Sequence, residues 1–584
     1  MEIVKDEKVM DKQAKVPRRK KGGLIAIPFI MANDSFEKVA SNGLLPNMIL
    51  YLTRDYNMEL ARGTNIIFYW SAATNFMPLL GAFISDSFLG RFLTIIFGSI
   101  ASLLGTTLFW LTTMIPGTKP PSCNQSSQNC VSPNAAQLAM LISSFVLMSI
   151  GAGGIRPCAL AFGADQLIKE NNSKSERLVG SFFGWYYASS SISVLVALTA
   201  IVYIQERMGW KVGFGVPAIL MLLATLFFLV ASKLYVKRKA SKSLLTGLVQ
   251  VLVAAFKKRK LALPPHISEG RYHRREDSTL NMPTTHLRFL NKACMIKNPD
   301  EEIASDGSAM DPWNLCTVEQ VEELKALIKV LPLWSTGIIQ TLDMSQHTFV
   351  LVQAGSMDRH LTSGFQIPAG SFAVFGIITV AVWIAVYDRA IIPLASKIRG
   401  RPTRLGVKLR MGIGVFLSCM AMVVSAIVET FRRRKAKGLQ NNPNAVVPMS
   451  AMWLAPQLCL GGLSEAFNAI AQIEFYYSEF PKSMSSIATS FLGLGIAFGN
   501  LLASVIVDLV DGYTRRGGKV SWVSKNINEG RYDYYYWILA VLCFINVGYF
   551  IICGWIYGPC AEELNGVQEE KVPEVEEELG TSGK

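Results

Sequence analysis

The sequence predicts an all-α membrane protein of about twelve transmembrane helices in two six-helix halves. Of its 584 residues, 51% are hydrophobic and only 17% are charged, so the chain is more apolar than a typical soluble protein. Apolar stretches long enough to cross a hydrocarbon core of about 30 Å recur almost to the end of the chain. A large soluble protein would instead bury runs of about 10–14 apolar residues.

The expected spans are separated by polar loops. They cover residues 23–53, 64–88, 91–115, 136–160, 178–205, 212–236, 324–353, 367–393, 406–430, 450–475, 484–510 and 534–557. The domains are therefore an N-terminal tail (1–22), a first six-helix bundle (23–236), a linker (237–322), a second six-helix bundle (323–557) and an acidic tail (558–584). This is the major facilitator arrangement, in which two halves rock around a site near the membrane midplane.

Basic residues predict how the chain is oriented. Those at 18–21 precede the first span and place the N-terminus in the cytoplasm, with no cleavable signal peptide. An even number of spans returns the C-terminus to the cytoplasm. One basic segment, residues 432–437, falls in a loop expected outside, and we interpret it as tolerated because the bias is a sum over loops. The net charge of +14 is therefore attributed to orientation, and no nucleic-acid partner is expected.

The linker is expected to contact membrane lipid. Its apolar run 243–256 is too short to span and is followed by basic residues at 257–260, which favours an interfacial helix on anionic lipid. Three nearby histidines stand in a charged, loop-like setting and are interpreted as solvated, so no metal is expected: His266, His273 and His286.

The polar loop 116–135, expected outside, carries two features that are typical of extracellular segments. Cys123 and Cys130 could form a disulfide there. Asn124 begins a glycosylation sequon that lies between the two cysteines. The other cysteines lie mostly in expected spans, where a thiol behaves as a small hydrophobe.

Charges in the first span indicate a functional site, because a charged side chain inside a membrane costs at least about 2.5–3.5 kcal/mol. Asp34, Glu37 and Lys38 stand three and four residues apart, so two carboxylates and an ammonium share one helical face. If the cation is drawn to another partner, a carboxylate can take up a proton. We interpret the three residues as a proton-binding group; the alternative is a static buried ion pair.

Other spans carry polar residues that could bind substrate or serve as charge partners. Arg156, in a glycine-rich stretch of the fourth span, can pair with an acid of the first span or face an anion. Asp343 lies in the seventh span, with Gln346 and His347 one turn further on, and Glu465 lies in the tenth. A lone histidine in a span is more often packed than functional, so the sequence leaves open whether His347 lines the pathway.

Asp86 and Arg91 flank the short turn between the second and third spans. Such charges can latch one half of a transporter to the other in one state and release it in the next. The alternative is a surface turn held by an exposed ion pair, which contributes about 0–1 kcal/mol.

Short motifs recur at well-separated places. The first span reads Asp34-x-x-Glu37-Lys38, and further motifs stand at 81–95, 162–166, 357–359 and 480–481. Together they resemble the proton-coupled oligopeptide transporter family, in its plant nitrate/peptide transporter branch, whose acidic signature has glutamate in the first place. The resemblance covers essentially all spans. It implies that the acidic motif couples transport to protons and that Glu465 matches the family's glutamate in span ten.

Departures from the family pattern bear on the substrate. Arg156 replaces a family lysine, and because arginine titrates less readily it suits a fixed charge partner. Ser41 and Asn42 stand where peptide-transporting members have tyrosines, which weakens the peptide interpretation. The nitrate-binding histidine of a studied relative aligns nearest to Asp343. By the same resemblance, Thr94 matches a threonine that is a phosphorylation switch in a relative, which implies a kinase as partner.

The sequence therefore predicts a multi-pass plasma-membrane symporter that moves a small anionic solute with protons. Segments 184–191 and 480–486 resemble a subgroup associated with low-affinity nitrate movement, so nitrate is the first expectation. The alternatives are a plant hormone or other organic anion, then a peptide, or a transport-linked sensor. An enzyme is least expected, because no nucleophile–base set or phosphate-binding loop is found and no cofactor is implied.

Overall fold

The computed structural model describes most of the chain. Cys123, Cys130 and Asn124 lie outside the described residues, as do nearly all of the N-terminal tail and most of the acidic C-terminal tail. The described residues are 22–121, 131–167, 173–238, 244–266, 270–274, 282–305, 307–400, 405–439, 445–481 and 484–560.

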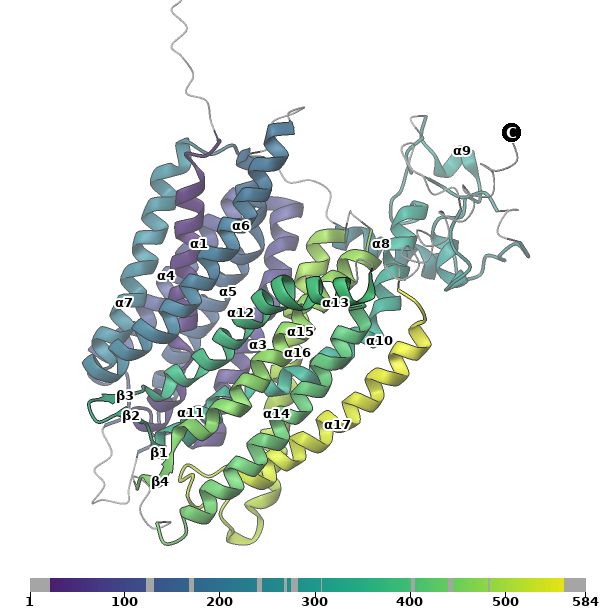
Figure 1. Cartoon of the computed structure of the whole chain (residues 1–584). Helices are drawn as coiled ribbons and strands as arrows, with labels where there is room; N and C mark the ends of the chain where they lie inside the picture. Colours follow the sequence, from purple (N-terminus) through teal and green to yellow (C-terminus); the bar gives the residue numbers. More distant parts are fainter. Residues whose placement is uncertain are drawn as a thin grey trace, which may run out of the picture.

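The first half of the described chain is a bundle of long helices, here called the N-terminal bundle (Figure 1). The residue Gly209 has a φ of +78° and breaks α7, so the chain reverses direction there. The helices are α1 (Ile27–Leu44), α2 (Met48–Arg54), α3 (Leu60–Ile84), α4 (Arg91–Met114), α5 (Ala135–Leu167), α6 (Ser173–Val196) and α7 (Val202–Val230).

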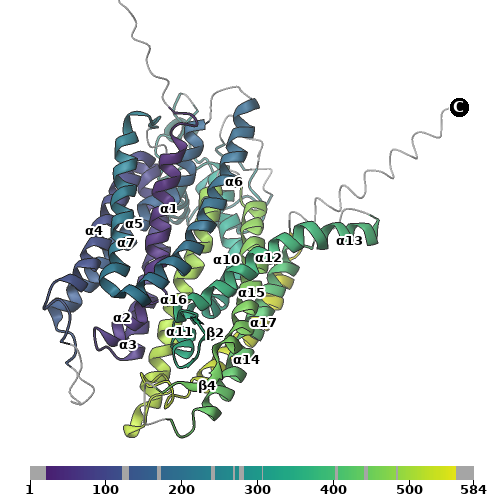
Figure 2. The ribbon, with the colours of Figure 1, turned by 60° about the vertical axis from the view of Figure 1, so that its left-hand side comes forward.

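The second half, the C-terminal bundle, packs beside the first (Figure 2). Its helices are α10 (Val318–Ser345), α11 (His347–Gly355), α12 (Val374–Val386), α13 (Ile392–Arg399), α14 (Val407–Lys435), α15 (Ala455–Glu479), α16 (Ser485–Thr514) and α17 (Tyr532–Tyr557). Short strands join its loops: β1 (Met357–Asp358) pairs parallel with β4 (Val447–Ser450), and β2 (His360–Thr362) pairs antiparallel with β3 (Phe365–Gln366).

Eight helical stretches among the described residues are long and apolar enough to cross a membrane, which makes the protein an all-α membrane protein. One of them, 178–233, contains the break at Gly209 and covers two expected spans. The expected spans 23–53, 324–353 and 450–475 coincide with α1–α2, α10–α11 and α15, which do not meet the same criteria of length and apolarity. These helices carry Asp34, Asp343 and Glu465, so the predicted site is itself a reason for their lower hydropathy.

Close packing within the N-terminal bundle requires glycine. A Cβ atom on Gly81 of α3 would lie 1.8 Å from the carbonyl oxygen of Gly153 in α5, and one on Gly151 would lie 2.4 Å from Ser102 of α4. The backbones of these helices therefore touch directly, and the glycine-rich stretch of the fourth span serves helix packing.

The bundles have two distinguishable ends. α1 begins and α17 ends at the upper end in Figure 1, which we call the inner end. The loops with β1–β4 mark the opposite, outer end. Among the described residues, the polar contacts that join the bundles lie at the outer end. Two examples are the Ser371 hydroxyl, which donates to the Leu198 carbonyl at 2.9 Å, and Ser504, which donates to Asn65 at 2.9 Å. The structure is thus closed at the outer end.

The linker forms a small unit at the inner end of the C-terminal bundle. Leu248 and Val251 of α8 (Leu244–Lys257) are buried in one apolar cluster with residues of α10 and α15. A short helix, α9 (Pro299–Glu302), is tied to the end of α8 by an ion pair of 3.0 Å between Lys258 and Glu302. The linker is therefore packed on the C-terminal bundle.

Burial in the linker corrects one expectation. His266 and His286 are exposed, as expected, but His273 is 6% exposed and therefore not solvated. Burial lowers its pKa. Burial also raises the pKa of the thiols of Cys294 and Cys316 to about 12, so both thiols pack as apolar groups. Sequence patterning missed this folded linker because its hydrophobic residues are scattered among polar ones.

The basic segment at 432–437 is also different from what the sequence indicated. α14 runs on to Lys435, so Arg432 and Arg433 are helical rather than in a loop. Arg432 is fully buried against Glu429 at 2.7 Å, and Arg433 pairs with Asp533 at 2.7 Å. Paired arginines contribute little net charge, which accounts for two of the five basic residues of this segment.

Candidate functional site

The charged residues of the first span form one connected cluster in the N-terminal bundle. Lys38 pairs with Asp34 at 2.7 Å, one helical turn away. Arg156 reaches across from α5 and donates to both oxygens of Glu37, at 3.0 and 3.3 Å. Tyr186 of α6 donates to the other oxygen of Asp34 at 2.8 Å, and the Lys38 ammonium lies 4.7 Å from the centre of its ring. The sequence left two partners open for Arg156, and the structure selects Glu37.

The cluster is neutral when both acids are ionised, because two carboxylates face two cations. The carboxylates of Asp34 and Glu37 are 1–2% exposed, whereas Lys38 and Arg156 are 17% and 26% exposed. The acids are thus enclosed and the cations line the accessible side. A proton added to either acid leaves one cation uncompensated, and that cation can attract an anion.

A small cavity of about 60 Å³ lies in the C-terminal bundle, between α10, α11, α12, α14 and α15. Asp343 and Glu465 both line it, and no hydrogen bond or ion pair is described for either carboxylate. Gln346 and His347 stand at the break between α10 and α11 and also line the cavity. The predicted residues of the seventh and tenth spans therefore come together, in a cavity separate from the first-span cluster.

A buried amide in the lining of the cavity favours a polar occupant. Gln457 is 3% exposed, and its amide oxygen and nitrogen both lack a hydrogen-bond partner among the described atoms. A buried amide in that state costs about 1–3 kcal/mol unless a solute or water binds it. Gly461 also lines the cavity, and a Cβ atom on it would lie 3.2 Å from an oxygen of Asp343. The Asp343 carboxylate thus rests against the backbone of α15.

The gating pair predicted at the turn between the second and third spans, Asp86 and Arg91, does not join the two bundles in this structure. Arg91 pairs with Asp165 of α5 at 2.6 Å, and Arg238 joins the same carboxylate at 3.4 Å. Asp86 lies at the end of the same turn, partly buried. In this structure these charges join helices within the N-terminal bundle rather than the two bundles to each other.

Thr94, the predicted phosphorylation site, is buried. It is 5% exposed, and its hydroxyl donates to the carbonyl of Gly90 at 3.0 Å. Its own carbonyl oxygen would lie 2.7 Å from a Cβ atom on Gly154 of α5. A kinase therefore needs a conformation in which the start of α4 has separated from α5.

Sequence reasoning missed three members of the sites. Tyr186 and Asp165 lie far along the chain from the residues that they contact, and Gln457 has no charge to mark it. The signal for Tyr186 was available in the segment 184–191, which the sequence had already connected with the family. No residue group that could hold a metal ion is found among the described residues.

The fold is that of an all-α membrane protein. Its helices enclose a neutralised charge cluster and an acid-lined cavity, and this combination is that of a membrane transporter. The chain belongs to the POT family (PTR2), which it matches over residues 92–523. Members of this family are transporters and not enzymes, which confirms that expectation.

Curated relatives place the chain in the plant branch. It is 60% identical to Protein NRT1/PTR FAMILY 1.2 of Arabidopsis thaliana, over 95% of this chain and 93% of the relative. It is 58% identical to Protein NRT1/PTR FAMILY 1.1 of the same plant, over 95% of both chains. The family resemblance drawn from the motifs is therefore confirmed.

Solved structures show the same fold. An auto-inhibited POT family peptide transporter has a TM-score of 0.64 and 18% identity, covering 91% of this chain and 96% of that chain. A POT family transporter in complex with 5-aminolevulinic acid has a TM-score of 0.60 and 13% identity, covering 92% and 99%. At these identities the likeness concerns the fold alone.

Proposed function

We propose that this protein is a proton-coupled symporter of a small anion, with low-affinity transport of nitrate across the plasma membrane as its function. The observation that carries the proposal is the neutral cluster of Asp34, Glu37, Lys38 and Arg156. One proton makes the cluster cationic, so a proton and an anion bind together with no net change of charge in the membrane interior. Binding must be weak enough to permit release, as in any carrier.

The proposal includes the topology. We assign twelve membrane spans in two six-helix halves, with the inner end in the cytoplasm and both termini there. Support comes from the basic residues at 18–21 and from the coincidence of every expected span with a helix. A protease added to the outside of intact cells should then leave epitope tags at both termini intact.

The first test is uptake of labelled nitrate by cells that express the protein, at external pH of about 5.5 and 7.5. We expect faster uptake at the acid pH, and a loss of that stimulation in Glu37→Gln. If the protein reaches the cell surface and takes up no nitrate, the anion is a different one, and the search moves to plant hormones and other organic anions.

A second candidate is favoured by the cavity of the C-terminal bundle. Asp343 and Glu465 offer two carboxylates with no cation described beside them, which suits the ammonium group of a zwitterionic solute such as a short peptide. One structural relative is described in complex with 5-aminolevulinic acid, which carries an amino group. Inhibition of uptake by a dipeptide, lost in Asp343→Asn, would favour this candidate over nitrate.

We further propose that α8 lies on anionic lipid of the inner membrane surface. Its buried face packs on the C-terminal bundle, but Val249, Leu252 and Phe256 form an exposed apolar stripe on the other side. The half-exposed Lys257 follows directly. In lipid nanodiscs, amide exchange in α8 should be slower with anionic lipid than with neutral lipid, and Leu252→Gln should reduce the difference.

The remaining proposal is that a kinase acts through Thr94. Because the hydroxyl is enclosed in this structure, modification would trap a conformation in which α4 and α5 have separated. A transport-linked sensor would use the same change, and an altered cellular response in a variant that no longer transports would support it.

A further inference from the structure

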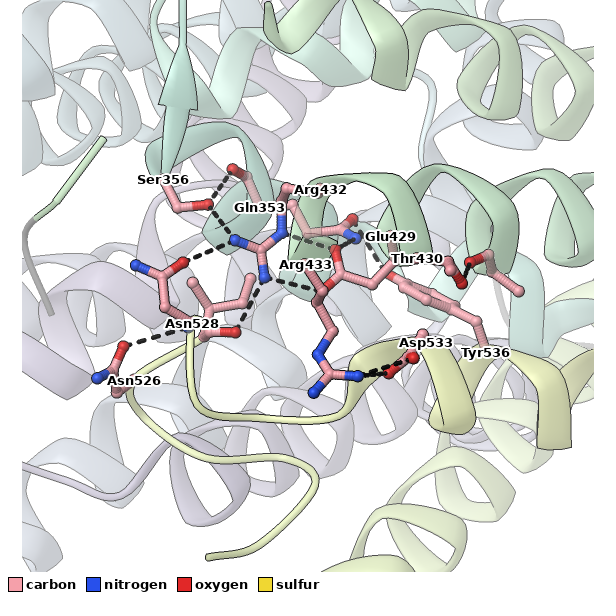
Figure 3. A network of polar contacts seen from close by, with 12 residues as sticks. Gln353, Ser356, Glu429, Thr430, Arg432, Arg433, Asn526, Asn528, Asp533 and Tyr536 are labelled. Carbon is pink, nitrogen blue, oxygen red and sulfur yellow. Dashed lines mark hydrogen bonds and ion pairs between the residues drawn. The ribbon is translucent and has the colours of Figure 1, made fainter. Parts of the chain in front are cut away.

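A fully buried arginine lies at the outer end of the C-terminal bundle (Figure 3). Arg432 donates all five of its guanidinium hydrogens: two to Glu429 at 2.7 and 2.8 Å, and one each to Ser356 at 3.2 Å, Asn528 at 2.8 Å and the carbonyl of Ile527 at 2.9 Å. The acceptors come from α14, from the end of α11 and from the loop before α17.

Glu429, the partner of this arginine, is equally enclosed. It is 0% exposed and also accepts a hydrogen bond from Gln353 of α11 at 2.7 Å. Tyr536 of α17 donates in turn to the Gln353 side chain at 3.2 Å. A buried ion pair is often no more stable than well-packed apolar residues of similar size, so its value is better sought in the geometry that it imposes.

The segments that Arg432 holds both lead to contacts with the N-terminal bundle. Three residues after Ser356, Arg359 pairs with Glu206 of α7 at 2.8 Å. The loop that contains Asn528 begins after α16 with Arg515, which pairs with Glu59 beside α3 at 2.8 Å. Both of the ion pairs that join the bundles among the described residues thus lie on segments that are hydrogen-bonded to the Arg432 guanidinium.

These outer ion pairs are individually weak. Arg515 and Glu59 are 50% and 61% exposed, and Glu206 is 34% exposed. Exposed ion pairs contribute little because water competes with them and because two flexible side chains must be ordered. They contribute most to closure of the outer end if the segments that carry them are already fixed in place, because little entropy is then lost on closure.

We infer that Arg432 is a positioning residue of the outer gate: it fixes the Arg359 and Arg515 segments together, so that both cross-bundle ion pairs form at once. The gate then closes and opens as one unit when the two bundles rock. This role is independent of the solute carried, so it stands or falls separately from nitrate transport.

The experiment reads the gate with a reporter cysteine. Val202 is fully buried at the outer end, where a Cβ atom on Gly370 would lie 3.0 Å from it. Val202→Cys, in a Cys123→Ser/Cys130→Ser background, is exposed to a membrane-impermeant maleimide only when the outer end opens. Ser356→Ala and Asn528→Ala, here called the arm variants, each remove one hydrogen bond that Arg432 donates and leave the Arg432–Glu429 pair intact.

We expect each arm variant to raise the labelling rate on intact cells by about three- to tenfold, the effect of one hydrogen bond on an opening equilibrium. The double variant Arg359→Gln/Arg515→Gln should do the same. Thr430→Ala is the matched control, because the one hydrogen bond described for this hydroxyl runs to the carbonyl of Ala426 in its own helix. Unchanged labelling in both arm variants, or equal acceleration in the control, would overturn the inference.

Discussion

Arg156 donates two hydrogen bonds to Glu37, at 3.0 and 3.3 Å, and a third to the hydroxyl of Ser41 at 2.8 Å. The guanidinium thus holds the acid on one side and a small hydroxyl on the other, where peptide-transporting relatives were expected to carry tyrosine. Because arginine keeps its charge, protonation of Glu37 would release a permanent cation toward the accessible side of the cluster.

The first prediction concerns proton coupling. Glu37→Gln removes the negative charge but keeps the shape of the side chain, so Arg156 stays cationic at every pH. We expect acid-stimulated uptake to fall at least about tenfold, a typical loss for a proton-transfer group, while surface expression stays normal. Glu301→Gln, an exposed acid in the linker, is the control. Full acid stimulation in Glu37→Gln would remove Glu37 from the coupling group.

Closure of the outer end gives a second prediction. A Cβ atom on Gly370 would lie 2.5 Å from the side-chain oxygen of Asn47, so Gly370→Ala places a wedge between the bundles. Overpacking costs about 1–3 kcal/mol, and the maximal transport rate should therefore fall at least about fivefold. Gly364→Ala, in the same loop with nothing within 4 Å, should transport normally. Equal rates in the two variants would show that the bundles do not close there.

Stability supplies a third prediction. Arg432→Met leaves Glu429 buried without its cation, which should destabilise the protein by about 3–5 kcal/mol. Replacing both residues, as Arg432→Met/Glu429→Met, should recover most of that loss. Thermal unfolding in detergent measures both variants. A double variant no more stable than the single one would mean that the pair supplies more than charge compensation.

The acid-lined cavity gives a fourth prediction. Gly461→Ala places a methyl group 3.2 Å from the Asp343 carboxylate and should displace it. If a solute binds there, its half-saturation concentration should rise several-fold with little change in stability. Gly548→Ala in α17, where nothing lies within 4 Å, is the control. Unaltered transport kinetics in Gly461→Ala would place the solute elsewhere.

The sequence predicted the helices well, because an apolar run of membrane length has few alternatives. It also brought Asp34, Glu37 and Lys38 together, since their spacing on one helix fixes their proximity. Contacts between distant segments were harder: Tyr186 stands 152 residues from Asp34, and no local pattern connects them. Only the packed fold shows that α6 passes close to α1.

At the outer end of α14, by contrast, a local sign in the sequence was available and the prediction was still wrong. The apolar run stops near residue 430, so the sequence placed Arg432 in a loop and counted it as a free positive charge. Glu429 stands three residues earlier, at helical spacing, and was an available sign that the helix continues. What patterning could not supply is the burial of that pair by the loop before α17, which depends on tertiary packing.

Symport by this protein requires that one proton on the first-span cluster accompanies the anion. Purified protein in liposomes that contain a pH indicator tests it most directly: nitrate is added outside, and internal pH is recorded without an imposed gradient. We expect nitrate to acidify the interior of liposomes with the native protein and not of those with Glu37→Gln. Nitrate entry with no acidification, or equal acidification in both, would contradict it.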